Sequence, residues 1–346
     1  MAGNPYDIRN KLRYHPGHLQ KIIDGKRPFP LNVEIDVTNL CNHSCKFCNV
    51  ADFLEREKQS LSVDLVMRVL GELNELGTIS INWTGGGEPL LYKNFEKVVK
   101  YSKNLGFVNG LMTNGALMHR YPEDFFIDNF KWVRVSMAGL SAETYKVVQG
   151  KNDFEQVLNN IDSLNKRIKE KSSPLSLGIA LLVNKENQHC LSNLLENNLY
   201  KELDYVQLRQ NMFDFDEKWW KDEISPWRKK FESSGLRILG VMYADNPMLK
   251  PKVQECAAHF CVGTITANGK VKFCKNTRDV EKFDIGDLNH MSLKEIWGNS
   301  QMNLELERSI DTINCQQYTP TCRNMPINYY VDDLRNPPWS INHEFL

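Results

Sequence analysis

Residues 33–48 read VEIDVTNLCNHSCKFC, a short alternating strand followed directly by three closely spaced cysteines. Apolar residues occupy one face of the predicted strand, which leaves Glu34 and Asp36 on the other face. Cysteines at such spacings bring their thiolates together from one loop, so we expect a metal centre at the carboxyl end of this strand. The spacing is C-x3-C-x2-C, and the residues are Cys41, Cys45 and Cys48.

Short apolar strands followed by helical stretches recur along the chain. The predicted strands cover residues 33–38, 79–84, 107–112, 132–137, 175–183 and 205–209. The predicted helices cover residues 61–76, 94–105, 141–169, 187–199 and 217–233. Alternation of strands and helices indicates βαβ crossovers and a parallel sheet. The sequence therefore predicts an α/β fold, an open or partial (βα)6 barrel rather than a complete eight-stranded one.

Polar residues recur on one face of several predicted strands. A sheet covered by helices on both sides is apolar on both faces, so a repeated polar face predicts a lumen that holds a polar substrate. Strand ends that reach solvent are the alternative. The candidate substrate-binding residues are Glu34, Asp36, Asn82, Arg134, Gln207 and Arg209.

Composition excludes several classes of protein. The 346 residues carry 43 basic and 43 acidic side chains, and a neutral chain lacks the positive charge of a nucleic-acid or membrane-surface binder. The sequence has neither a long apolar run nor a secretory signal, which predicts a cytoplasmic protein without membrane contact. Nine cysteines cannot all pair, and in a reducing compartment thiols serve metals or catalysis.

Zinc and a four-iron cluster are alternative occupants of the first cysteine array. Zinc takes four ligands in structural sites, and His43 is the local candidate for the fourth. Three thiolates on a four-iron cluster leave one iron open to a small molecule.

The segment WTGGGEPLL (83–91) follows the second predicted strand. Its glycines permit close backbone approach and positive φ, and Glu88 offers a carboxylate for an ammonium group. A tight turn with a surface glutamate is the alternative.

With both motifs in this order, the chain resembles radical S-adenosylmethionine (radical SAM) enzymes. The resemblance implies that the cysteines 41, 45 and 48 hold a SAM-binding [4Fe–4S] cluster. Ala138 departs from the family's pattern, which has an acidic residue there. The resemblance also implies contacts to SAM from Phe47, Thr84, Gly85, Gly86, Gly87, Glu88, Asn114, Ser136, Leu182 and Val183. For the last four, an ordinary strand-end turn with satisfied polar groups is the alternative.

A second group of cysteines surrounds a predicted β-hairpin. The segment TITANGKVKFC (264–274) contains Asn268-Gly269, a strong hairpin dipeptide. This region resembles the SPASM and twitch domains of radical SAM enzymes, which implies an auxiliary [4Fe–4S] cluster. Cys261 is an alternative ligand to Cys256 and a candidate hydrogen donor, and a small buried residue is the simpler interpretation. The implied ligands are Cys256, Cys274, Cys315 and Cys322.

We expect four regions in the chain. They are an N-terminal extension (1–30), a radical SAM core (31–245), an auxiliary-cluster domain (246–330) and a C-terminal tail (331–346).

The resemblance implies reductive cleavage of SAM to a 5′-deoxyadenosyl radical that takes a hydrogen atom from the substrate. A polar small molecule such as a sugar or aminocyclitol is expected, with oxidation or epimerisation as the outcome. Modification of a ribosomal peptide, by crosslinking or epimerisation, is the alternative, and a non-catalytic iron–sulfur or zinc module is a third. An electron donor such as flavodoxin or ferredoxin is the expected protein partner, and no nucleic acid is expected.

Overall fold

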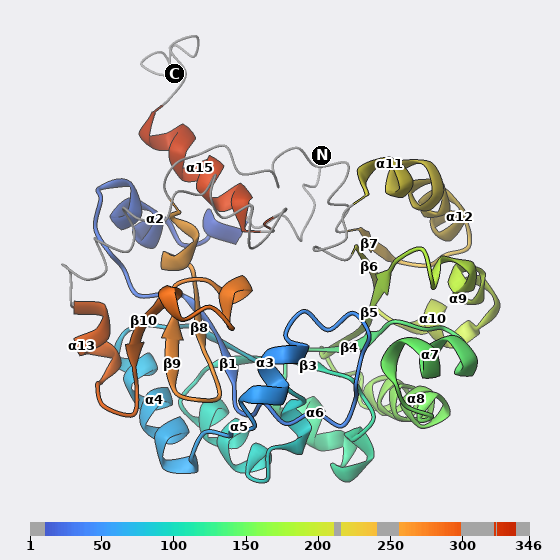
Figure 1. Cartoon of the computed structure of the whole chain (residues 1–346), viewed down its shortest axis with the longest axis horizontal. Helices are drawn as coiled ribbons and strands as arrows, with labels where there is room; N and C mark the ends of the chain where they lie inside the picture. Colours follow the sequence, from blue (N-terminus) through green and yellow to red (C-terminus); the bar gives the residue numbers. More distant parts are fainter. Residues whose placement is uncertain (1–10, 211–215, 241–255, 299–321, 323, 337–346) are drawn as a thin grey trace.

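One ten-stranded sheet organises the molecule. The computed structural model describes residues 11–210, 216–240, 256–298, 322 and 324–336. Within them the strand order is β10-β9-β8-β1-β2-β3-β4-β5-β6-β7, and Figure 1 shows the sheet with helices along its outer side. Strands β1 to β7 run parallel to their neighbours, so the predicted α/β fold with a parallel sheet is confirmed.

The six predicted strands all form. The sequence did not predict β7, which is too short to show alternation. The parallel strands are β1 (Asn32–Asp36), β2 (Ser80–Thr84), β3 (Val108–Thr113), β4 (Trp132–Met137), β5 (Ser176–Val183), β6 (Tyr205–Gln210) and β7 (Ile238–Gly240).

Helices connect successive strands, as the alternation predicted. Those of the barrel region are α3 (Ala51–Arg56), α4 (Val63–Glu75), η1 (Pro89–Leu91), α5 (Phe95–Asn104), η2 (Met118–Arg120), α6 (Glu123–Asn129), α7 (Ala142–Gln149), α8 (Phe154–Glu170), η3 (Gln188–Ser192), α9 (Asn193–Glu196), α10 (Asn198–Glu202), α11 (Glu217–Trp219), η4 (Trp220–Ile224) and α12 (Ser225–Ser233).

The predicted helix 141–169 is in fact two helices, α7 and α8. Gly150 adopts φ +71°, and its N–H bonds to the Lys146 carbonyl at 3.0 Å. A glycine in the left-handed region is a common helix terminator, because a side chain there would strain the backbone. Ser141 begins α7 as predicted, and its hydroxyl accepts the Thr144 N–H at 3.2 Å. The break places residues 149–153 beside the cysteine loop.

The sheet separates an apolar face from a polar one. Val33, Ile35, Ile81 and Trp83 are at most 2% exposed and belong to one apolar cluster with α4 and α5. Each such side chain contributes about 1.5–3 kcal/mol when buried, which holds the helices on this face. The opposite face carries the polar residues of the strands and is called the lumen face below.

A C-terminal hairpin extends the barrel sheet. Strand β8 (Val262–Ile265) pairs in parallel with β1 and antiparallel with β9 (Lys270–Lys272). The predicted turn forms, with Gly269 at φ +82°. Region 256–298 therefore shares a sheet with the barrel. Its other elements are η6 (Ala258–Phe260), η7 (Lys275–Thr277), η8 (Glu281–Phe283), β10 (Asp284–Asp287) and α13 (Leu293–Gly298).

The two ends of the described chain meet in a second apolar cluster. Helix α2 (Pro16–Ile23) lies beside α15 (Met325–Arg335), and Leu19, Ile22 and Ile327 pack there with η6. Helix α15 continues across residue 331, where the sequence suggested the start of a tail. No helix in the described part of the chain is long and apolar enough to span a bilayer.

Candidate functional site

The first cysteine array occupies the loop that follows β1. Cys41 is exposed, while Cys45 and Cys48 are half-buried, and the Cys48 N–H bonds to the Cys45 carbonyl at 3.1 Å. Burial, together with the neighbouring Cys41 and Cys48 thiols, raises the pKa of Cys45 to about 12. The three thiols come from one loop of eight residues, 41–48. Thiolates are the protein ligands of iron–sulfur clusters, so this donor set fits one.

His43 anchors the cysteine loop from behind. Its Nε2 lies 3.0 Å from a carboxylate oxygen of Asp153, and its Nδ1 lies 3.3 Å from the Gln149 amide nitrogen. Both ring nitrogens are thus engaged by the α7–α8 segment, so His43 is not the fourth zinc ligand considered from the sequence. In the described residues no three His, Cys, Asp or Glu side chains are arranged to hold a single metal ion.

The glycine segment is joined directly to the cysteine loop. The Gly87 N–H bonds to the Thr38 carbonyl at 3.1 Å, and the Glu88 N–H bonds to the Leu40 carbonyl at 2.8 Å. A Cβ on Gly87 would lie 2.1 Å from the Leu40 carbonyl oxygen, so only glycine fits. The sequence predicted positive φ angles for these glycines, and that prediction is wrong. Gly85, Gly86 and Gly87 are not among the residues with positive φ. Close approach is what requires these glycines.

Hydrogen bonds between Glu88 and the end of β3 bring Asn114 into the same site. The buried Glu88 carboxylate accepts hydrogen bonds from Thr113 Oγ1 and the Asn114 N–H, each at 2.7 Å, and from the Leu90 N–H at 3.1 Å. Burial raises the pKa of Glu88 to about 7, although these three hydrogen bonds act to lower it. Asn114 also donates to the Asn42 side chain at 2.8 Å. Glu88 is therefore no surface residue, and the cysteine loop, glycine segment and β3 end form one network.

The remaining candidate SAM contacts differ in exposure. Ser136 on β4 is exposed, and Phe47 and Leu182 are half-buried. Val183 is fully buried in the main apolar cluster, which leaves Leu182 as the residue of that pair on the lumen face. The Ala138 N–H, at the position that departs from the family pattern, bonds to the side-chain Oε1 of Gln149 at 2.8 Å.

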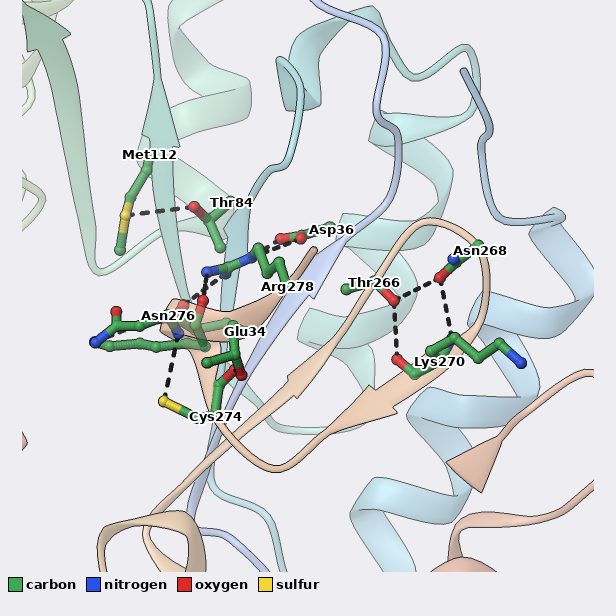
Figure 2. A network of polar contacts seen from close by, with 12 residues as sticks. Glu34, Asp36, Thr84, Met112, Thr266, Asn268, Lys270, Cys274, Asn276 and Arg278 are labelled. Carbon is green, nitrogen blue, oxygen red and sulfur yellow. Dashed lines mark hydrogen bonds and ion pairs between the residues drawn. The ribbon is translucent and has the colours of Figure 1, made fainter. Parts of the chain in front are cut away.

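Two of the lumen candidates carry buried charges that are paired. Arg278, from the segment after Cys274, donates to Asp36 at 2.7 Å and to Glu34 at 2.8 Å (Figure 2). The Lys275 ammonium lies 3.7 Å from Glu34. Residues 275–278 therefore cover the lumen face of β1, an arrangement that the sequence did not predict.

The other lumen candidates lie on β2, β4 and β6. Asn82 donates to the Asn32 side chain at 3.0 Å, and Arg134 donates to Gln207 at 3.2 Å. Gln207 and Arg209 are half-buried and two residues apart on β6, so both belong to the lumen face. This side of the lumen therefore combines two arginines with amide groups.

The second group of cysteines also converges. Burial, with the thiols of Cys322 and Cys256, raises the pKa of Cys274 to about 12, and Lys275 acts in the opposite direction. The Asn276 N–H lies 3.5 Å from the Cys274 sulfur, and the Asn328 amide lies 3.7 Å from the Cys256 sulfur. These three thiols fit a shared cluster. The fourth predicted ligand, Cys315, lies outside the described residues.

Cys261 belongs to the second apolar cluster, against which Cys256 also packs. It is 5% exposed within the second apolar cluster, beside Leu12, Ile22 and Phe260, and burial raises its pKa to about 12. The structure thus groups Cys256 with Cys274, while Cys261 packs as a small apolar residue. Cys190 is likewise buried and donates to the Asn187 carbonyl at 2.9 Å.

Sequence reasoning missed several residues that shape the site. Arg278 gave no signal, because its carboxylate partners lie 242 and 244 residues away. Gln149 and Asp153 were hidden inside a single predicted helix, although Gly150 marks the break. Asn39 is 1% exposed, and its side-chain oxygen would lie 2.3 Å from a Cβ on Gly86.

Comparison with known proteins gives matches in both regions. A model of the radical SAM superfamily matches residues 35–197, and a model of the SPASM iron–sulfur cluster-binding domain matches residues 256–324.

Among curated proteins, the chain is similar to the probable GTP 3′,8-cyclase of Sulfurisphaera tokodaii, with 26% identity over 74% of this chain and 84% of that one. It is also similar to the PqqA peptide cyclase of Bradyrhizobium diazoefficiens, with 25% identity over 52% of this chain and 46% of the relative. The chain thus spans less than half the length of the second relative.

Among solved structures, Streptococcus suis SuiB bound to its precursor peptide SuiA superimposes with a TM-score of 0.68. That match has 16% identity and covers 94% of this chain and 76% of SuiB, so it shows a shared fold.

Proposed function

We propose that this chain, a member of the radical SAM superfamily with a SPASM iron–sulfur cluster-binding domain, oxidises a polar substrate that carries an anionic group. The family's two domains imply SAM and [4Fe–4S] clusters as cofactors. When bound and reduced, these cofactors supply a 5′-deoxyadenosyl radical that abstracts a hydrogen atom.

The observation that carries the proposal is the direct joining of the cysteine loop to the glycine segment. The hydrogen bonds from Gly87 to Thr38 and from Glu88 to Leu40 fix these two motifs at the ends of neighbouring strands. Cys41, Cys45 and Cys48 would hold the first cluster. The buried Glu88 carboxylate, which has no ion-pair partner among the described residues, would face the amino end of SAM.

Charge on the lumen face supports an anionic substrate. Glu34 and Asp36 are paired with Arg278, and Lys275 also lies 3.7 Å from Glu34, so two cations compensate the two negative charges within the protein. Arg134 on β4 and Arg209 on β6 also belong to the lumen face, and Arg134 donates a hydrogen bond to Gln207. Arginine binds phosphate and carboxylate groups in a bidentate manner, so these two residues suit either group.

The class of substrate has two candidates. The curated relatives are named for GTP and for a peptide, and neither supports the sugar or aminocyclitol expected from the sequence. A phosphorylated or carboxylated small molecule suits the lumen arginines. A peptide with an acidic side chain is the second candidate, favoured by the match to the PqqA peptide cyclase.

Oxidation is proposed rather than epimerisation. Epimerisation requires a hydrogen donor, and the Cys261 thiol lies in the second apolar cluster beside α2. Cys274, by contrast, is followed directly by the residues that cover the lumen face of β1. An auxiliary cluster held there would accept the electron of the substrate radical, with a proton released to solvent. A flavodoxin or ferredoxin is the proposed donor for the first cluster.

The test uses the anaerobically reconstituted enzyme with dithionite, SAM and a panel of substrates. We expect 5′-deoxyadenosine to accumulate with phosphorylated or carboxylated compounds, measured by mass spectrometry. Arg134→Met should raise the KM for such a compound about tenfold or more, since a charged hydrogen bond contributes about 1.5–3 kcal/mol. Equal turnover of neutral analogues contradicts the substrate class. A protein that holds iron but never cleaves SAM is a non-catalytic module instead.

A further inference from the structure

Four buried charges lie between the first strand of the barrel and the auxiliary-cluster hairpin. The side chains of Glu34 and Asp36 are 4% and 0% exposed, and those of Lys275 and Arg278 are 6% and 12% exposed. Two acids and two bases make the group neutral overall. Charges removed from water in this way are tolerated because each one has a close partner of opposite sign.

This group reaches both candidate cluster sites. On one side Asp36 lies opposite Thr84 at the end of β2, directly before the glycine segment. On the other side Lys275 directly follows Cys274, and the Arg278 guanidinium donates to the Lys275 carbonyl. Figure 2 shows Arg278 between the two carboxylates, with Cys274 and Asn276 beside it. Strand β1 itself leads to the loop of Cys41.

We propose that Glu34, Asp36, Lys275 and Arg278 are positioning residues that dock the Cys274 segment onto β1 and tune the electron affinity of the auxiliary cluster. The inference rests on the proposed function only in requiring a cluster at Cys274. Arg278 fixes the segment, and Glu34 lies 3.7 Å from the ammonium of Lys275, the residue that directly follows Cys274.

The signs of the charges determine the expected effects. A buried cation beside a cluster favours the form with the extra electron, and a buried anion disfavours it. Removing the Lys275 charge should therefore lower the potential of the auxiliary cluster. Removing the Glu34 charge should raise it, because the lysine then acts without compensation.

The experiment is a redox titration of the reconstituted holoenzyme, followed by electron paramagnetic resonance, without substrate. The variants are Lys275→Met and Glu34→Gln, with Lys270→Met as the matched control. Lys270 lies in the same hairpin and pairs with Asp287 at 2.9 Å, away from Cys274. We expect shifts of the auxiliary signal in opposite directions for the first two variants and none for the control.

A disturbance of packing alone would not give opposite signs. Shifts in the same direction, or unchanged potentials with full iron content, overturn the proposal. If the Lys275→Met variant loses its auxiliary iron, the Glu34→Gln variant alone tests the proposal, because glutamine keeps the shape of glutamate. An unchanged potential in that variant also overturns the proposal. The readout needs no turnover, so a wrong substrate assignment leaves it unaffected.

Discussion

Replacement of Arg278 by methionine gives the sharpest test of how the two parts of the chain are held together. The variant keeps most of the side-chain volume but leaves the Asp36 and Glu34 carboxylates without the guanidinium that lies 2.7 and 2.8 Å from them. Breaking a buried ion pair by removing one partner costs about 3–5 kcal/mol. Lys275 remains 3.7 Å from Glu34 and offsets part of this loss. We therefore expect a loss near the lower bound, about 3 kcal/mol.

The assay is anaerobic urea unfolding of the iron-loaded protein, followed by tryptophan fluorescence. With a slope of about 3 kcal/mol per molar urea, the midpoint should fall by about 1 M. The triple variant Glu34→Gln, Asp36→Asn, Arg278→Met removes the unpaired charges and should recover at least half of the loss. The partly exposed pair of Lys270 with Asp287 provides the control, since Lys270→Met should cost only about 1 kcal/mol.

The deficit of Arg278→Met should also depend on pH. Burial raises the pKa of Asp36, and Arg278 opposes this rise, so its removal raises the pKa further. When a carboxyl group has a higher pKa in the folded state than in the unfolded state, the stability of the fold decreases as the pH rises from the unfolded-state pKa to the folded-state pKa. The deficit should therefore be smaller at about pH 5 than at about pH 8. A loss under about 1 kcal/mol, a deficit independent of pH, or a triple variant no better than the single one would refute the reasoning.

Three further predictions concern the SAM site. Gly87→Ala should abolish SAM binding in equilibrium dialysis, because its Cβ would lie 2.1 Å from the Leu40 carbonyl oxygen; near-normal binding would contradict the close approach. Cys45→Ala should lower bound iron by about four per chain and stop 5′-deoxyadenosine formation, whereas retained cleavage would refute the ligand assignment. Asp153→Asn weakens the 3.0 Å bond to His43 and should speed iron loss to a chelator several-fold, whereas Asp162→Asn, in an exposed pair on the same helix, should not.

Local patterns predicted the parallel strands and the meeting of the motifs. Alternation over five or six residues is enough to define a strand, and the carboxyl ends of neighbouring parallel strands lie at one edge of the sheet. The glycine segment and Asn114 were therefore expected near the cysteine loop, and the hydrogen bonds of Glu88 bring them together.

Contacts between distant parts of the chain could not be predicted from local sequence patterns. Nothing near Glu34 indicates that its partner is Arg278, since a carboxylate on a lumen face is equally suited to a substrate. His43 was a reasonable zinc ligand by spacing alone, and only the position of Asp153 directs its ring elsewhere. The pairing of β8 with β1 likewise depends on tertiary structure, because parallel neighbours need no proximity in sequence.

The pairing of β8 with β1 has a consequence for dissecting this protein. A fragment that ends before residue 256 would leave β1 as an edge strand, with the backbone groups of residues 32–35 on that side exposed. Its Glu34 and Asp36 side chains would also lose their cationic partners. Unprotected edges template intermolecular pairing, so we expect such a fragment to aggregate. We therefore expect the barrel and region 256–298 to unfold together, and a cluster held at Cys274 would stabilise the strand that leads to Cys41.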